Sequence, residues 1–188
     1  MSPILGSFGG MAARAYGLFK PSSAATPIVG AYDALATVTV GAGGQSSITF
    51  SGIPQTYTHL QVRGNAITGA LGWVTLRFNG DSGSNYAFHE FRGDGSVASA
   101  NQVSSGVGYQ SFLHNTTVGS GVINILDYAN ANKNKTAQAL GGYDANGSGY
   151  ISATSGLWLN NSVINSFTIY STTSTFSQYS TFSLYGVR

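Results

Sequence analysis

The 188-residue sequence contains no cysteine, so it can form neither a disulfide framework nor a thiolate metal site. Charged residues are scarce as well, at 7 % of the chain, with eight basic and six acidic side chains. The basic side chains are too dispersed to form the electrostatic footprint of a nucleic-acid-binding protein. No apolar run approaches the roughly 18 residues that a membrane-spanning helix needs. We therefore expect no nucleic-acid partner and no membrane partner.

Gly, Ser, Thr and Asn take the place of the missing charges and account for 81 of the 188 residues. Gly, Asn and Ser favour tight turns, whereas β-branched and aromatic residues favour strands. The chain has only one Glu and three Lys, and these are residues that commonly fill helices. The composition therefore indicates an all-β protein with short strands.

The first 27 residues differ from the rest, because they contain three of the four prolines and no acidic residue. The first charge is Arg14, and glycines interrupt the apolar residues, so the segment lacks the features of a secretory signal. Pro21 would end a short helix over residues 10–20. We predict an extended or short-helical arm over residues 1–27 that anchors the chain in a partner; a disordered leader is the alternative. The predicted virion-anchoring side chains are Ile4, Leu5, Phe8, Met11, Tyr16, Leu18 and Phe19.

From residue 28 onward, apolar and polar residues alternate with a period of two. For example, Leu60 and Val62 alternate with Gln61 and Arg63, which is the pattern of a strand with one buried face. Turn sequences such as NGDSGSN and DANGSG separate these segments. We predict one domain over residues 28–188, an antiparallel, jelly-roll-like β-sandwich of about ten strands. The predicted strands cover residues 34–40, 48–50, 58–66, 73–79, 86–92, 121–128, 136–143, 150–159, 163–170 and 180–187, and residues 96–120 are predicted to form a long surface loop with one edge strand at most.

Seven segments stand out along the chain: MSPILG at its start, HLQVRG (59–64), RFNGDSGSNY (77–86), GDGS (93–96), INILDYAN (123–130), SGLWL (155–159) and FSLYGVR (182–188). Together, and in this order, they resemble a group of small tailed-bacteriophage virion proteins. No single motif is diagnostic, but the resemblance covers nearly the whole chain. It implies a non-enzymatic structural component of the virion, an accessory fibre or decoration protein on the capsid, neck or tail. It carries over no catalytic or ligand-binding residue.

Candidate catalytic groups are few. Asp81, Asp94 and Asp144 lie in predicted turns, where aspartate is favoured because its side chain caps the turn backbone. Glu90 and Asp127 lie on predicted strands, and nothing indicates that they form the paired acids of a glycoside hydrolase. The three histidines do not have the spacing of metal ligands. We therefore predict no enzymatic activity, no metal site and no cofactor.

Two tryptophans lie on strand faces that otherwise look polar. Trp73 shares a face with Thr75 and Arg77, and Trp158 shares one with Tyr150 and small hydroxyl residues. An aromatic ring among hydroxyl groups can anchor a protein interface or stack on a sugar, and ordinary core packing is the third possibility. The candidate interface or ligand-stacking residues are Trp73, Trp158 and Tyr150. The alternative function is therefore a carbohydrate- or receptor-binding module of a phage fibre that recognises a host-surface glycan.

Self-association is expected because few surface charges oppose it. Phage fibres and decoration proteins are commonly threefold, as the resemblance implies, and closed symmetry would cover strand edges that few Lys or Pro residues protect. We predict a homotrimer located in the virion, in contact with other virion proteins, with a homodimer as the second choice.

Overall fold

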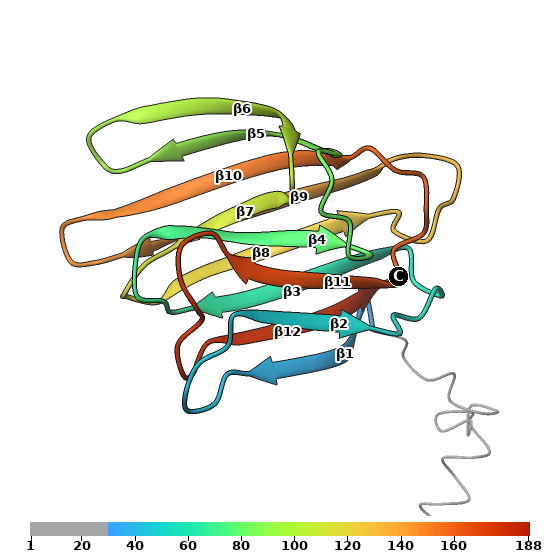
Figure 1. Ribbon diagram of the computed structural model, residues 1–188, viewed down its shortest axis with the longest axis horizontal. Coiled ribbons are helices and arrows are strands. Elements are labelled where there is room, and N and C mark those ends of the chain that lie inside the picture. The colour runs from blue at the N-terminus through green and yellow to red at the C-terminus, as the bar shows by residue number, and fades with distance from the viewer. Residues whose placement is uncertain (1–29) are drawn as a thin grey trace, which may run out of the picture. The chain divides into compact units, whose positions relative to one another are not determined.

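The computed structural model describes residues 30–188, which form twelve β-strands and no helix (Figure 1). The strands are β1 (Tyr32–Thr39), β2 (Ser47–Ser51), β3 (His59–Ala66), β4 (Gly72–Phe78), β5 (Tyr86–Gly93), β6 (Ala98–Gly106), β7 (Tyr109–His114), β8 (Gly119–Leu126), β9 (Lys135–Asp144), β10 (Gly149–Trp158), β11 (Ser166–Ser171) and β12 (Thr181–Val187). One compact unit extends from Ala31 to Arg188.

The strands form two sheets. The large sheet has the order β1-β12-β3-β8-β9-β10-β5-β6, and the small sheet has the order β2-β11-β4-β7. All neighbouring strands run antiparallel. One hydrophobic core contains side chains from both sheets, so the sheets pack face to face (Figure 1). The prediction of an all-β, antiparallel, sandwich-like fold is confirmed.

Period-two alternation explains why most of these segments form strands. In β4, Val74, Leu76 and Phe78 are at most 1 % exposed, whereas Arg77 between them is only half-buried. Leu60 and Val62 of β3 are fully buried in the same core. Each of the ten predicted strands overlaps one observed strand. The sequence pattern therefore located these strands correctly.

The prediction of a long surface loop over residues 96–120 is wrong, because this stretch contains β6, β7 and the start of β8. β6 is an edge strand of the large sheet and is exposed along most of its length. β7 is an edge strand of the small sheet, and its last four residues, from Ser111 to His114, are all buried. Its pairing with β4 also shifts register between Val74 and Thr75. Neither strand alternates, so the sequence contains no period-two signal for them.

Candidate functional site

The two candidate tryptophans lie in different surroundings. Trp158 is 2 % exposed and stacks on the ring of Tyr86, with 6.4 Å between the ring centroids. The indole Nε1–H of Trp158 donates to Oδ2 of Asp81 at 2.7 Å. The prediction of Trp158 as an interface or ligand-stacking residue is therefore wrong, because its ring is part of the core. Trp73 is half-buried and lies on the outer face of the small sheet, opposite the buried Val74.

The polar face of β10 points inward, which explains the error at Trp158. Ser152 and Thr154 are 1 % and 5 % exposed, whereas Ile151 is 61 % exposed. The hydroxyl of Tyr109 in β7 lies 2.6 Å from Oγ1 of Thr154, so this buried polar group has a partner. A Cβ at Gly156 would lie 2.4 Å from the ring of Tyr109. Small residues on the inner face of β10 thus make room for the large aromatic side chains of β7.

The third candidate, Tyr150, is half-buried near the start of β10. The centroids of its ring and that of Tyr143 are 6.0 Å apart, and the guanidinium of Arg92 lies 5.9 Å from the Tyr150 centroid. Tyr150 therefore stays a candidate for ligand stacking. The predicted anchoring residues lie outside the described residues, and they are Ile4, Leu5, Phe8, Met11, Tyr16, Leu18 and Phe19.

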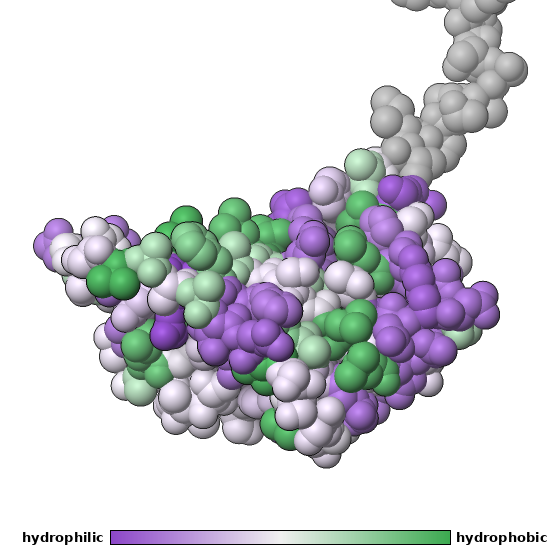
Figure 2. Space-filling view, turned by 90° about the horizontal axis from the view of Figure 1, so that it is seen from above, coloured by the Kyte–Doolittle hydropathy of each residue, from purple (hydrophilic) through white to green (hydrophobic). Residues whose placement is uncertain are grey.

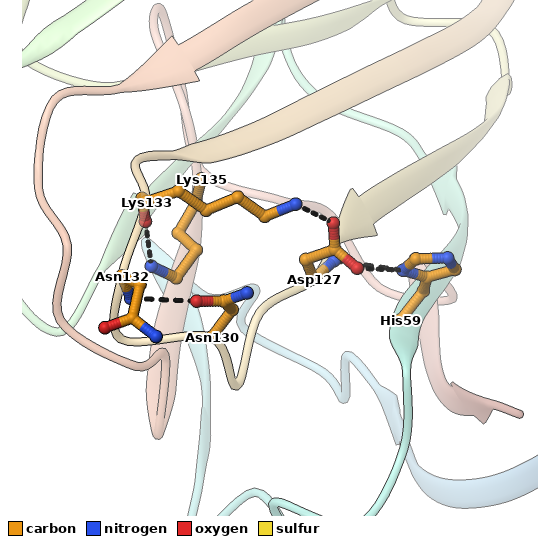
Figure 3. Close-up of polar contacts among 6 residues, drawn as sticks. All are labelled: His59, Asp127, Asn130, Asn132, Lys133 and Lys135. Atoms are coloured by element: carbon orange, nitrogen blue, oxygen red, sulfur yellow. Dashed lines mark hydrogen bonds and ion pairs between the residues drawn. The ribbon is translucent and has the colours of Figure 1, made fainter.

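His59, Asp127 and Lys133 come together where β3 begins and β8 ends (Figure 3). The Lys133 ammonium donates to Oδ2 of Asp127 and holds the pKa of that carboxyl below its usual range. The backbone N–H of Asp127 donates to Nδ1 of His59 at 2.9 Å. In the same loop, Oδ1 of Asn130 accepts the N–H of Asn132 at 2.8 Å. These contacts fix the connection between β8 and β9.

This cluster does not have the geometry of a catalytic His–Asp pair, in which the carboxylate accepts the Nδ1 proton of the histidine. Here Nδ1 of His59 is itself an acceptor and lies 3.5 Å from Oδ1 of Asp127. The neighbouring Lys135 is fully buried, and its Nζ donates to the carbonyls of Lys133 at 2.6 Å and Asn161 at 3.0 Å. The side chain of Lys135 therefore ties the β8–β9 loop to the loop after β10. The arrangement supports a structural role.

The carboxylate of Asp81 is committed to local structure in the same way. It accepts hydrogen bonds from Trp158, from the side chain of Asn85 and from the N–H of Gly83. Burial alone would raise the pKa of Asp81, but these three hydrogen bonds outweigh burial and lower it. Asp81 therefore stays ionised and anchors the turn between β4 and β5 to the core.

The remaining predicted candidates among the acids show no catalytic arrangement. Asp94 and Asp144 each accept backbone N–H groups within their own turns, as expected for turn caps. Glu90 is 5 % exposed, burial raises its pKa, and the guanidinium of Arg92 lies 3.8 Å away. Within residues 30–188, no group of three His, Asp or Glu side chains is placed to hold a metal ion.

A row of apolar side chains crosses the outer face of the large sheet. Val122, Leu140, Ala153, Phe91 and Ala100 are direct cross-strand neighbours on β8, β9, β10, β5 and β6, and we call these five residues the apolar row. Phe91 is 56 % exposed and Leu140 is 58 % exposed. Figure 2 shows that hydrophobic residues gather in patches on the surface. The sequence does not reveal this row, because the hydroxyl residues of β10 make their own face look like the outer one, although Ser152 and Thr154 are buried and Ala153 is exposed.

An open groove adjoins the apolar row on the same face, across β12, β3, β8 and β9. Its volume is about 440 Å³, and its lining residues are Arg63, Gly64, Asn65, Ser120, Gly121, Val122, Leu140, Thr181 and Ser183. A second hollow of about 350 Å³ shares Ser120 and Leu140 with it and extends to Asp144 and Ile151. Together they form a continuous depression across the sheet, which we call the outer groove.

Arg63 is the charged residue that lines the 440 Å³ part of the outer groove. Its Nε–H donates to Oε1 of Gln61 at 2.8 Å, and the Gln61 amide donates to Oδ1 of Asn124 at 2.9 Å. The guanidinium carbon lies 4.6 Å from the ring centroid of Tyr185 and 5.3 Å from that of Tyr32. These contacts hold the cationic group in a defined position beside the groove.

No protein-family model, curated protein or solved structure matches this chain. Within the described part of the chain, no helix is long and apolar enough to cross a membrane. Function is therefore inferred from the chain's own residues, fold and surface.

Proposed function

We propose that this chain is a non-enzymatic structural protein of a tailed-bacteriophage particle, an accessory fibre or decoration protein located in the virion. The seven segments that resemble small virion proteins support this role. Three of them coincide with strands of the sandwich: HLQVRG lies in β3, and SGLWL and FSLYGVR, except for their last residues, lie in β10 and β12. The engagement of Asp81, Asp94, Asp127 and Asp144 in structural contacts supports a non-enzymatic role.

We further propose that the sandwich is a jelly roll to which two hairpins have been added. Without the hairpins β5–β6 and β9–β10, four strands remain in each sheet, in the orders β1-β12-β3-β8 and β2-β11-β4-β7. When the eight remaining strands are numbered 1 to 8 in chain order, the two sheets have the strand orders 1-8-3-6 and 2-7-4-5. These orders support a jelly-roll arrangement. Jelly rolls recur in viral capsid domains and in lectins.

The apolar row is the observation that carries the proposal of assembly. Contiguous exposed apolar side chains mark interaction surfaces in many proteins. Here Phe91 and Leu140 stand in register with three smaller apolar residues across five strands. Covering the β10, β5 and β6 residues of this row with another copy would remove apolar surface from water, at about 25 cal/mol per Å². We propose a homotrimer joined through these residues, Ala153, Phe91 and Ala100, which leaves Val122 and Leu140 exposed, with residues 1–27 docked into other virion proteins.

Light scattering of the full chain tests the assembly. The wild type should have the mass of a trimer, and the variant Phe91→Ser should have the mass of a monomer. The control is Leu71→Ser/Leu159→Ser, which changes two exposed leucines outside the row, 43 % and 47 % exposed in the wild type. It should stay trimeric. A monomeric wild type, or an unchanged mass for the row variant, would contradict the role of the row.

Antibody labelling of purified phage particles tests the location. Antibodies raised against residues 28–188 should label one defined region of the virion. Particles assembled with a chain that lacks residues 2–27 should lose this labelling, while the truncated chain itself stays folded. Unlabelled wild-type particles would contradict the virion role, and full labelling with the truncated chain would contradict the anchoring role of the arm.

A further inference from the structure

We propose that the outer groove binds an acidic polysaccharide and that Arg63 binds one of its carboxylates. This inference goes beyond the structural role proposed above and does not depend on it. It rests on the shape of the groove, on the position of one cationic group, and on the polar and apolar side chains beside that group.

The groove is built from two neighbouring cross-strand rows of side chains. One row contains Ser183, Arg63, Val122 and Leu140, and the next contains Thr181, Asn65 and Ser120. Between these rows, the backbone of Gly64 and Gly121 forms the floor, where no side chain projects outward. The four strands span about 14 Å at a strand spacing of about 4.8 Å. This length and the volume of about 440 Å³ suit a linear ligand rather than a compact one.

Arg63 has no carboxylate partner among residues 30–188. The ion pairs in this part of the chain involve His59 and Lys133 with Asp127, Arg92 with Glu90, and Arg188 with Asp33. The hydrogen bond to Gln61 uses Nε of Arg63, which leaves the terminal guanidinium nitrogens for an external acceptor. A guanidinium binds a carboxylate through two parallel hydrogen bonds. Because Tyr185 and Tyr32 already hold the side chain, little conformational entropy is lost when a ligand binds.

The surroundings of Arg63 fit a sugar chain better than a nucleic acid. Asn65, Ser120, Thr181 and Ser183 offer amide and hydroxyl groups that can exchange hydrogen bonds with sugar hydroxyls. Val122 and Leu140 offer an apolar wall for the C–H face of a sugar ring. A nucleic acid would need several cations along the groove to neutralise successive phosphates, and its 440 Å³ part is lined by one.

The far end of the outer groove differs from the Arg63 end. Ile151 lies there near Leu140 and extends the apolar wall, whereas the rings of Tyr143 and Tyr150 lie on the opposite face of the sheet, where Tyr150 approaches Arg92. The carboxylate of Asp144 also lines this end, where it accepts the N–H of Asn146. Because Asp144 would repel an acidic group, we place the bound carboxylate at Arg63 and a neutral part of the chain near Ile151.

Isothermal titration calorimetry on the full chain tests the proposal with oligogalacturonate and oligoalginate as acidic probes. The methyl ester of the same oligogalacturonate is the neutral probe, and it preserves the rings while removing the charge. The wild type should bind at least one acidic probe at least tenfold more tightly than the ester. Arg63→Gln should weaken that binding at least tenfold. The affinity of Arg63→Lys for the acidic probe should lie between those of the wild type and Arg63→Gln.

Arg77→Gln is the matched control variant. Arg77 lies on the small sheet, its guanidinium also packs on a tyrosine ring, at 4.5 Å from the Tyr170 centroid, and its Nε–H donates to the carbonyl of Val107. This variant should bind the acidic probe as the wild type does. Failure of the wild type to bind either acidic probe, equal binding of acid and ester, or equal losses in both variants would overturn the proposal. All three chains should keep the same oligomeric mass, so failure of the trimer proposal is detected separately.

Discussion

The ring of Phe112 in β7 lies against the backbone of Gly121 in β8. A Cβ at Gly121 would be 2.3 Å from Cδ1 of Phe112, closer than two such atoms can approach. Gly64 and Gly141 are the cross-strand neighbours of Gly121, and Cβ atoms there would also meet Phe112, at 3.3 Å and 2.8 Å. Three glycines in register thus let the small sheet place a large aromatic ring close to the large sheet.

We expect Gly121→Ala to lower the free energy of unfolding by about 1–3 kcal/mol, because the added methyl group overpacks the core against Phe112. Urea denaturation of the variant and the wild type measures the difference. Gly41→Ala is the control, because a Cβ at Gly41 would meet no atom of the described residues within 4 Å. The control should change the free energy of unfolding by less than about 0.5 kcal/mol. Equal effects at the two positions would contradict the close packing of the sheets.

The core contact between Asp81 and Trp158 gives a second prediction. Asp81→Ala should cost about 1–3 kcal/mol, because the buried Nε1–H of Trp158 then has no acceptor and the turn loses the caps at Gly83 and Asn85. Thermal unfolding followed by tryptophan fluorescence reports this change. Asp144→Ala, which removes an exposed turn cap to Asn146, is the control and should cost less. A loss at Asp144 as large as that at Asp81 would show that the bond to the indole adds little.

Sequence patterns predicted the strands well where one face of a strand is apolar. β4 is a clear example, since Val74, Leu76 and Phe78 all enter the core as their spacing indicates. In β10, apolar–polar alternation predicts the wrong buried face. Ser152 and Thr154 are buried because they lie opposite the large aromatic residues of β7, and such complementarity involves residues more than 40 positions apart. Local alternation cannot detect it, so the face of Trp158 was misassigned.

The candidate site was less predictable than the fold. Alternation places Arg63 on the polar face of its strand, and this part of the site follows from sequence. The groove itself depends on the register of β12, β3, β8 and β9, which brings Ser183, Arg63, Val122 and Leu140 into one row. No local pattern encodes this register, because the paired strands are far apart along the chain.

Burial of His114 predicts a specific dependence of stability on pH. The side chain of His114 is fully buried, and burial lowers its pKa to about 4 from an ordinary value of 6.5. Its Nδ1 lies 2.8 Å from the hydroxyl of Thr68, and its Nε2 has no hydrogen-bond partner among residues 30–188. Because the unfolded chain binds a proton at this side chain more readily than the folded chain, stability should fall as the pH drops from 6.5 towards 4.

The expected loss from His114 is about 3 kcal/mol at pH 4 relative to pH 7. Urea denaturation at several pH values between 4 and 7 measures it. The variant His114→Gln should be less stable at pH 7 but should show a flatter profile across this range, because glutamine does not titrate. Identical profiles for wild type and variant would assign the acid sensitivity to other groups.

Two lysines separated by one residue provide the last prediction, because they make opposite kinds of contact. Lys135 is fully buried, and its ammonium group donates to the carbonyls of Lys133 and Asn161. Lys133 has a side chain that is 53 % exposed and pairs with Asp127 at the surface.

Lys135→Met preserves the aliphatic packing but leaves two carbonyls without their donor, so it should lower the free energy of unfolding by about 1–3 kcal/mol. Lys133→Met removes a surface ion pair, which is screened by solvent, and should cost no more than about 1 kcal/mol. Urea denaturation of both variants at low and high salt separates the two cases, since only the Lys133 contribution should weaken with salt. A larger cost at Lys133 than at Lys135 would mean that the surface pair, rather than the buried ammonium group, holds the β8–β9 loop.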